Sequence, residues 1–244
     1  MCGRFALQVT WAELYDWFNL LRPETEGPTM PARYNIAPTQ PIMAVQHGFD
    51  GAREGLLVRW GFIPAWVKDP GSFTLIINAR SETAAQKPSF KNAIRRRRIL
   101  IPATGFYEWQ RFGKNRKSQP YFVKPANDEI IAFGGLLETW IGGDGSEVDT
   151  ACIVTTEANE NFAPIHHRLP LVVQKPDFDT WLNCRDNGLD AIEPLMKPVA
   201  NDYFEPVPVS EAVNKVANAG PEVQDPVEPA EAPPEDRDEQ FSLF

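Results

Sequence analysis

Cysteine and histidine are scarce in this chain, with three residues of each among 244. The cysteines Cys2, Cys152 and Cys184 are scattered and odd in number, which argues against a disulfide framework or a zinc site and favours a reducing compartment. No apolar run approaches the ~20 residues of a membrane helix. The start has neither a basic n-region nor an apolar h-region. We therefore expect a cytoplasmic protein without a membrane partner, monomeric by default.

Negative charge is concentrated in one segment rather than spread over the chain. Residues 221–244 hold eight acidic residues and one arginine, whereas residues 1–220 hold 25 acidic and 23 basic residues. The body is therefore nearly neutral and can present a basic surface despite the net charge of -9. The acidic, proline-rich segment has too few apolar residues to offset the entropy of ordering, which predicts a disordered tail over 221–244.

Periodicity over the body predicts a β-rich α+β fold. Thr10 and Glu13 form a capping box ahead of apolar residues at helical spacing, which predicts a helix over 10–20. Further helices are expected over 81–85, 89–95, 176–182 and 189–196. Strands are expected over 42–46, 55–60, 75–77, 99–101, 121–124, 130–137, 151–155, 171–174 and 203–207. Short strands separated by Pro and Gly suit a curved sheet or partial barrel. The basic run 95–98 suits phosphate contact or a solvated helix end, and we favour the solvated end.

Cys2 is the first candidate for chemistry, because a cysteine directly after the initiator Met1 can become the first residue. Once Met1 is removed, Cys2 carries a free α-amine with a pKa of about 7.7–8.0 and a nucleophilic thiol. This 1,2-aminothiol condenses with an aldehyde: the amine forms an imine, and the sulfur then closes a five-membered thiazolidine ring.

Three further polar residues lie in contexts that suggest a site. Asn78 follows the apolar run 75–77, Glu108 lies among large aromatics, and His166 precedes a strand together with His167 and Arg168. A carboxylate among aromatics suits proton transfer. Taken singly, each has a structural explanation: Asn78 as a turn cap, Glu108 as an arginine partner, and the histidines as solvated loop residues.

Seven motifs occur together in a fixed order. They are Met1-Cys2-Gly3-Arg4-Phe5, Arg33-Tyr34-Asn35-Ile36-Ala37-Pro38, Trp60-Gly61-Phe62-Ile63-Pro64-Ala65-Trp66, Asn78-Ala79-Arg80-Ser81-Glu82-Thr83, Gly105-Phe106-Tyr107-Glu108-Trp109, Ile165-His166-His167-Arg168-Leu169-Pro170 and Val209-Ser210-Glu211-Ala212-Val213-Asn214-Lys215-Val216-Ala217-Asn218. This set resembles the SRAP family, the SOS-response-associated peptidase-like proteins that process abasic sites. The resemblance covers residues 2–218 and implies an SRAP domain over residues 1–220 of a bacterial protein.

The resemblance implies how the candidate residues act. Cys2 captures the aldehyde of an abasic site in single-stranded DNA as a thiazolidine DNA–protein crosslink, which protects the strand during replication. Glu108 transfers protons and orients the Cys2 amine, His166 serves sugar-ring opening and lyase-type proton steps, and Asn78 orients the sugar. The family is also thought to remove its own N-terminal residue, which here is only Met1. No metal or cofactor is implied.

The resemblance also implies a set of DNA contacts. Arg4, Arg80 and Arg168 are expected to hold phosphates, Trp66 to stack on a base and Asn35 to line the site.

The chain departs from the family pattern at three positions. His167 stands where many relatives have an acidic residue, which leaves the choice between His166 and His167 open. Val67 replaces a second tryptophan after Trp66. Ile99 stands where relatives often have cysteine, which leaves Cys2 as the nucleophile.

The last five residues suggest a protein partner. Gln240-Phe241-Ser242-Leu243-Phe244 resembles the Gln-x-x-Leu-Phe peptide by which bacterial DNA-processing proteins bind the sliding clamp. Gln240, Leu243 and Phe244 would be the anchors at the end of the tether.

Two other functions compete with abasic-site processing. The first is an N-terminal-nucleophile hydrolase of the glutamine amidotransferase type, in which the Cys2 thiol attacks an amide and its α-amine is the base. It predicts glutamine hydrolysis. The second is a non-catalytic single-strand-binding module, whose DNA binding would survive Cys2→Ser without a covalent adduct.

Overall fold

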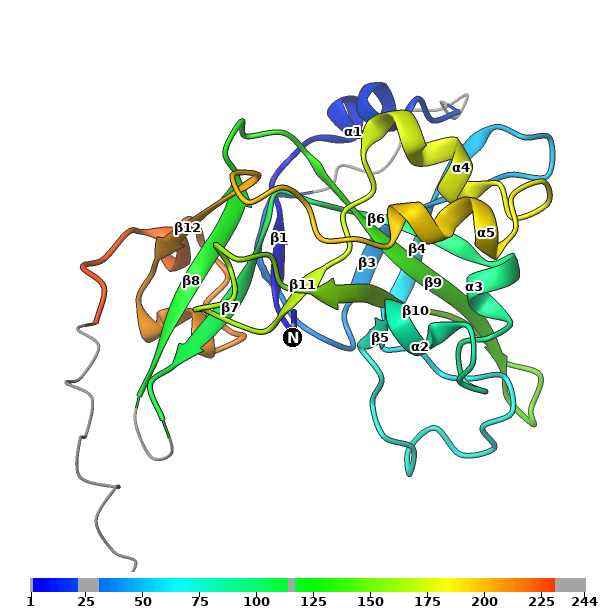
Figure 1. The fold of residues 1–244 in the computed structure, drawn as a ribbon. Coiled ribbons are helices and arrows are strands. Elements are labelled where there is room, and N and C mark those ends of the chain that lie inside the picture. The colour runs from blue at the N-terminus through cyan, green and yellow to red at the C-terminus, as the bar shows by residue number, and fades with distance from the viewer. Residues whose placement is uncertain (1, 22–30, 114–116, 231–244) are drawn as a thin grey trace, which may run out of the picture.

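Short strands and shorter helices make up the structure, a computed structural model that describes residues 2–21, 31–113 and 117–230 (Figure 1). The strands are β1 (Phe5–Leu7), β2 (Arg33–Ile36), β3 (Pro41–His47), β4 (Arg53–Trp60), β5 (Asn78–Arg80), β6 (Arg98–Ala103), β7 (Gly105–Arg111), β8 (Ser118–Pro125), β9 (Ile131–Ile141), β10 (Glu147–Glu157), β11 (Arg168–Pro170) and β12 (Phe204–Pro208). The α-helices are α1 (Trp11–Phe18), α2 (Ser81–Ala84), α3 (Ala93–Arg96), α4 (Phe178–Leu182) and α5 (Leu189–Ile192), and the 3-10 turns are η1 (Lys175–Asp177), η2 (Glu193–Leu195), η3 (Glu211–Asn214) and η4 (Pro221–Gln224).

Five of these strands close into a barrel. Strands β10, β4, β3, β6 and β9 are hydrogen-bonded in this order, and β9 pairs with β10 to complete the ring. The β10–β4 pair is parallel and the other pairs of the ring are antiparallel. Strands β5 and β11 extend β10 beyond the ring. The expected α+β class, with a curved, partly barrel-like mixed sheet and short flanking helices, is confirmed.

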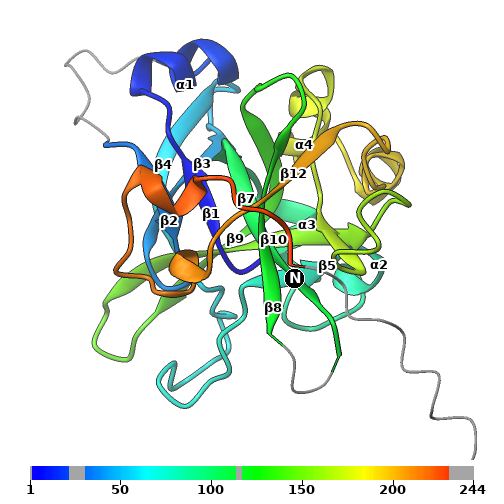
Figure 2. The ribbon, with the colours of Figure 1, turned by 90° about the vertical axis from the view of Figure 1, so that its left-hand side faces the viewer.

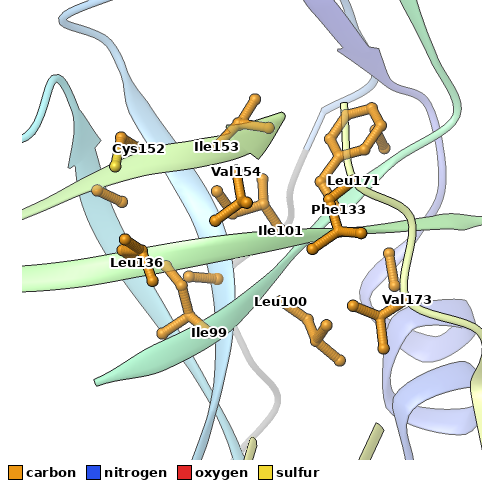
Figure 3. Packing of buried hydrophobic residues seen from close by; sticks show 14 of the residues in the cluster. Ile99, Leu100, Ile101, Phe133, Leu136, Cys152, Ile153, Val154, Leu171 and Val173 are labelled. Carbon is orange, nitrogen blue, oxygen red and sulfur yellow. The ribbon is translucent and has the colours of Figure 1, made fainter. Parts of the chain in front are cut away.

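Aliphatic side chains from β6, β9 and β10 pack against each other and form the centre of the core (Figure 3). Ile99, Phe133 and Cys152 are completely buried there. Each large side chain contributes about 1.5–3 kcal/mol through burial. The prediction that Cys152 is a buried core residue is confirmed, and Ile99 fills core space, so neither position can serve chemistry at the surface.

A second, antiparallel sheet of β12, β8, β7, β1 and β2 carries the N-terminal residues. Residues 209–230, here called the C-terminal strap, lie over this sheet (Figure 2). Val209, Val213 and Val223 of the strap are completely buried against Ala6 and Tyr107.

The strap corrects the predicted domain boundary at residue 220. Disorder is wrong for residues 221–230: Pro221–Gln224 forms η4, and the amide of Val227 donates to the carbonyl of Pro208 at 2.9 Å. The physical reason is local, because Val223 supplies apolar burial that the average composition of the tail conceals. Residues 231–244, including the predicted clamp-binding residues Gln240, Leu243 and Phe244, lie outside the described residues.

Helix α1 forms as expected, with both halves of the capping box present between Thr10 and Glu13. The expected strands over 75–77 and 171–174 are wrong in position, because pairing with β10 places β5 at Asn78–Arg80 and β11 at Arg168–Pro170. The helix expected over 89–95 is confined to α3. No helix in the described ranges has the length and apolar character needed to span a bilayer.

The solvated helix end expected for 95–98 is wrong for its last residue. Arg98 is 2% exposed, and its guanidinium donates to the carbonyls of Ile94, Trp181 and Asn187. Its charge therefore ties α3 to α4 and the segment that follows α4.

Candidate active site

The residues around Cys2 are positioned by β1 and β7. Phe5 lies opposite Phe106 in the antiparallel register, and the amide of Tyr107 donates to the carbonyl of Arg4 at 2.8 Å. The same register brings Glu108 of β7 beside the chain that leads into β1. Cys2 is 1% exposed and Glu108 is 4% exposed, so the thiol and the carboxylate share a desolvated environment.

Asn78 begins β5 and reaches the N-terminal segment. Its side-chain Nδ2 donates to the carbonyl oxygen of Cys2 at 3.0 Å. Its Oδ1 is buried and accepts no hydrogen bond from the residues that the structure describes. Asn78 therefore fixes the backbone of Cys2 with one end and offers an acceptor at the site with the other.

His166 lies in the turn before β11 and stacks on His167, with ring centroids 4.4 Å apart and ring planes 30° apart. Its Nδ1 lies 3.0 Å from the amide nitrogen of Arg168 and 3.2 Å from the carbonyl oxygen of the same residue. Either neutral tautomer of the imidazole therefore has a backbone partner at Nδ1. Nε2 can act as a donor in one tautomer and as an acceptor in the other.

Electrostatics couples three of these groups. Burial, followed by the negative charge of Glu108, raises the pKa of the Cys2 thiol far above its ordinary value, so the group is a thiol at neutral pH. Burial lowers the pKa of His166; the opposing pull of Glu108 is smaller than the effect of burial. A neutral imidazole and a protonated thiol beside a carboxylate form a site that is equipped to move protons.

Two of the five predicted DNA-contact residues are accessible. Arg80 ends β5 and is exposed, two residues after Asn78. Trp66 is 59% exposed on the segment between β4 and β5 and meets Phe73 edge-on at 5.6 Å. An exposed guanidinium and an exposed indole face suit phosphate and base contacts respectively.

Arg4 and Asn35 instead hold the C-terminal strap. Arg4 donates to Oδ1 of Asn35 at 2.7 Å and to the carbonyl of Val213 at 2.8 Å. The buried Nδ2 of Asn35 lies 2.7–3.2 Å from the carbonyls of Val213, Lys215 and Asn218. The amide of Asn35 is therefore hydrogen-bonded within the protein, and its predicted position in the lining of the site stays a prediction.

Arg168 is also used within the protein. It is 6% exposed, forms a bidentate ion pair with Glu82 at 2.8 and 2.9 Å, and donates to the carbonyl of Thr155 at 2.6 Å. In this structure the guanidinium is therefore held by Glu82 and Thr155, and its predicted phosphate contact stays a prediction. Sequence reasoning missed Glu82 as the partner, although Glu82 lies within the same motif as Asn78.

Comparisons with known proteins identify the family of the chain. The family model described as SOS response associated peptidase (SRAP) matches residues 1–216. The chain is 37% identical over 223 residues to "Abasic site processing protein YoqW" of Bacillus subtilis (strain 168), covering 91% of this chain and 98% of that protein. It is 32% identical over 233 residues to "Abasic site processing protein YedK" of Escherichia coli (strain K12), covering 93% and 100% of the two chains.

A solved structure of a protein from Bacteroides thetaiotaomicron has the same fold, with a TM-score of 0.80 at 22% identity over 93% of this chain and 100% of the other. The family model and the two relatives together cover nearly all of the described residues. The chain therefore belongs to the SOS response associated peptidase (SRAP) family.

Proposed function

We propose that this protein processes abasic sites in single-stranded DNA by covalent capture through Cys2, after removal of Met1. The observation that carries the proposal is the meeting of Cys2, Asn78, Glu108 and His166 in one site, where the thiol and the carboxylate are buried and Asn78 and His166 are half-buried. The proposal is also supported by two relatives, 37% and 32% identical to this chain, that are named abasic site processing proteins.

The capture needs no oxidant or reductant. The α-amine of Cys2 adds to the aldehyde carbon of the ring-opened deoxyribose, and the aldehyde oxygen leaves as water when the imine forms. The sulfur then adds to the imine carbon, and the thiol proton ends on the nitrogen. Glu108 carries protons between these atoms, which is necessary because burial keeps the thiol protonated.

His166 serves the opening of the sugar ring. Opening requires that the anomeric hydroxyl lose a proton and the ring oxygen gain one. With its Nδ1 proton donated to the carbonyl of Arg168 at 3.2 Å, the imidazole takes the proton of the anomeric hydroxyl at Nε2 and returns it to the ring oxygen. The lowered pKa keeps the ring neutral at pH 7, as this relay needs.

The crosslink would shield an unpaired template strand from β-elimination, which otherwise breaks it. Arg80 and Trp66 are the side chains placed to hold the flanking phosphate and base. The lyase-type steps and the removal of Met1 by the same site are part of this proposal. Its setting is the bacterial cytoplasm, with the protein acting as a monomer on replicating DNA.

The test is an intact-mass measurement before and after incubation with a single-stranded oligonucleotide that carries one abasic site. Wild type should lose Met1 and gain one denaturation-resistant adduct, less one water, whereas Cys2→Ala should gain none. Equal adduct formation by Cys2→Ala would refute capture by Cys2. Glutamine hydrolysis without an adduct would favour the hydrolase alternative, and DNA binding without an adduct in either protein would favour the binding module.

The C-terminal peptide 240–244 is proposed to tether the protein to the sliding clamp. Its support is the sequence alone: apolar Leu243 and Phe244 follow an acidic linker, a form that suits insertion into a preformed groove. Deletion of 240–244 should abolish clamp binding in a pull-down with purified clamp while capture in solution is unchanged. Equal clamp affinity after deletion would refute the tether.

A further inference from the structure

An arginine-lined pocket lies between the β3–β4 hairpin, α3 and the end of α4. Its volume is about 420 Å³. Four arginines and one histidine line it, and no carboxylate does so among the described residues. The side chains that carry its chemistry are His47, Phe49, Arg96, Arg97, Arg98 and Arg185.

Two of the arginines are committed to the fold. Arg98 is buried and donates to backbone carbonyls, and Arg97 pairs with Glu138 at 2.8 Å. Arg98 adds a positive charge to the wall, whereas the charge of Arg97 is offset by Glu138, and neither offers a mobile guanidinium. Arg96, exposed at the end of α3, and Arg185, after α4, are the two placed at the rim to meet a ligand.

Phe49 gives the rim an aromatic surface. It is 93% exposed in the loop between β3 and β4, and the guanidinium of Arg185 lies 5.5 Å from its ring centroid. A single exposed aromatic residue is ordinary. Proteins that bind single-stranded nucleic acids combine an exposed aromatic ring, on which a base stacks, with cations that contact the phosphates. The rim of this pocket offers both, and none of the described residues that line it carries a carboxylate.

We propose that this pocket binds the phosphodiester backbone of single-stranded nucleic acid, with Arg96 and Arg185 on phosphates and Phe49 stacked on a base. The site is separate from the Cys2 site: Cys2 lies beside β5, where Asn78 donates to its carbonyl, whereas in Figure 1 α4 lies above β4 and β6, and β5 lies below them. The inference rests on the proposed function in one respect, namely that single-stranded DNA is the ligand of this protein. It adds a second, non-reacting contact that would hold the strand while Cys2 acts.

The protein's own acidic tail is the other polyanion that this pocket could attract. The described chain ends at Ala230, whose amide donates to Gln119 of β8 at 3.0 Å. In Figure 1 β8 and α4 lie on opposite sides of the molecule, so the tail begins far from the pocket. This geometry favours a nucleic-acid strand as the occupant.

The test compares the full-length double variant Arg96→Ser/Arg185→Ser with the control Lys87→Ser/Lys197→Ser, which loses the same charge from two exposed lysines elsewhere. Binding of a 20-nucleotide single strand without an abasic site is measured by fluorescence anisotropy at several salt concentrations. Loss of two phosphate contacts should reduce the slope of log K against log salt by about 1.4, at ~0.7 for each contact. Phe49→Ala should weaken binding about 5- to 150-fold, as for one base–aromatic stack, with the slope unchanged.

Three results would overturn the proposal. The first is a double variant whose slope and affinity equal those of the control. The second is loss of binding of a deoxynucleoside monophosphate by the double variant, while the double variant and the control bind the strand with the same affinity. This result would assign the pocket to free nucleotides. The third is loss of binding by the double variant to a peptide of residues 231–244, again with unchanged strand affinity, which would assign it to the tail.

Covalent capture separates a failure of this inference from a failure of the proposed function. Wild type and both double variants are incubated with a five-nucleotide strand that carries an abasic site. Equal capture in all three shows that the Cys2 site is intact, so that the anisotropy result concerns the pocket alone. If wild type captures nothing, the proposed function fails, whereas the binding slopes still decide the role of the pocket.

Discussion

Removal of the Arg168 guanidinium is expected to destabilise the fold without changing the intrinsic affinity of the folded protein for DNA. Arg168→Ala removes a bidentate ion pair with Glu82 and the bond to the carbonyl of Thr155. Hydrogen bonds to charged groups contribute about 1.5–3 kcal/mol each. The side chain of Glu82 is 43% exposed and regains water after the substitution, whereas the Thr155 carbonyl stays in the sheet. These contributions lead us to expect a loss of about 3 kcal/mol.

Urea unfolding measures this loss. With a denaturant slope of about 3 kcal/mol per molar, the midpoint should fall by roughly 1 M. Glu82→Gln keeps the shape of the partner and should cost less, and the double variant should cost less than the sum of the two single variants. The matched control is Arg80→Ala, which removes an exposed arginine: it should leave the midpoint nearly unchanged and reduce the salt slope of single-strand binding by about 0.7.

The opposite pattern would refute this reasoning. If Arg168→Ala kept its urea midpoint but lost salt-dependent DNA affinity, the guanidinium would be a phosphate ligand, as the sequence motif suggested. The ion pair with Glu82 would then describe only the unbound protein.

Three further perturbations have expected outcomes. Asn78→Ala removes one hydrogen bond of about 1 kcal/mol to the Cys2 carbonyl and should slow single-turnover capture about 5-fold; an unchanged rate would remove Asn78 from the positioning of Cys2. Because burial lowers the pKa of His166 below its ordinary 6.5, the ratio of wild-type to His166→Ala capture rates should fall with decreasing pH with a midpoint below 6.5, and a midpoint above 6.5 would contradict this. Asn35→Ala should cost about 2–3 kcal/mol in urea unfolding and make residues 209–230 cleavable in limited proteolysis; a resistant strap would show that Asn35 is not needed to hold it.

The elements that were predictable from sequence carry their signal locally. Helix α1 has its capping box and apolar spacing within eleven residues, β9 begins with a run of apolar residues and glycines, and β10 has an apolar centre over 151–154. Strands β1, β2 and β7 escaped prediction. Strand β1 is only three residues long, and β2 and β7 mix Arg, Asn, Gly and Glu with aromatics and lack the alternation of a half-buried strand. Their conformation depends on pairing with one another, which no short window of the sequence reveals.

For the site, residue type and motif order were enough to predict that Cys2, Asn78, Glu108 and His166 lie together, but not to tell which arginines are accessible. Arg168 is occupied by Glu82, 86 residues away, and Asn35 by Val213, 178 residues away. The sequence of a motif does not show whether a guanidinium or an amide in it binds a ligand or a carbonyl or carboxylate of its own chain, because the hydrogen-bonding groups are the same in both cases. Only the fold decides between these partners.

The C-terminal strap has a consequence for the order in which the molecule is assembled. Arg4 contacts Val213 across 209 positions of the chain, and Gln8 contacts Gln224 across 216. The first strand thus acquires its final neighbours only after almost all of the chain has left the ribosome. Contacts of such sequence separation make folding slow, since the entropy of loop closure precedes their stabilising effect. During synthesis the segment around Cys2 cannot form its contacts with the C-terminal strap until the strap has been made. The surroundings of Cys2 are therefore among the last parts of the protein to fold.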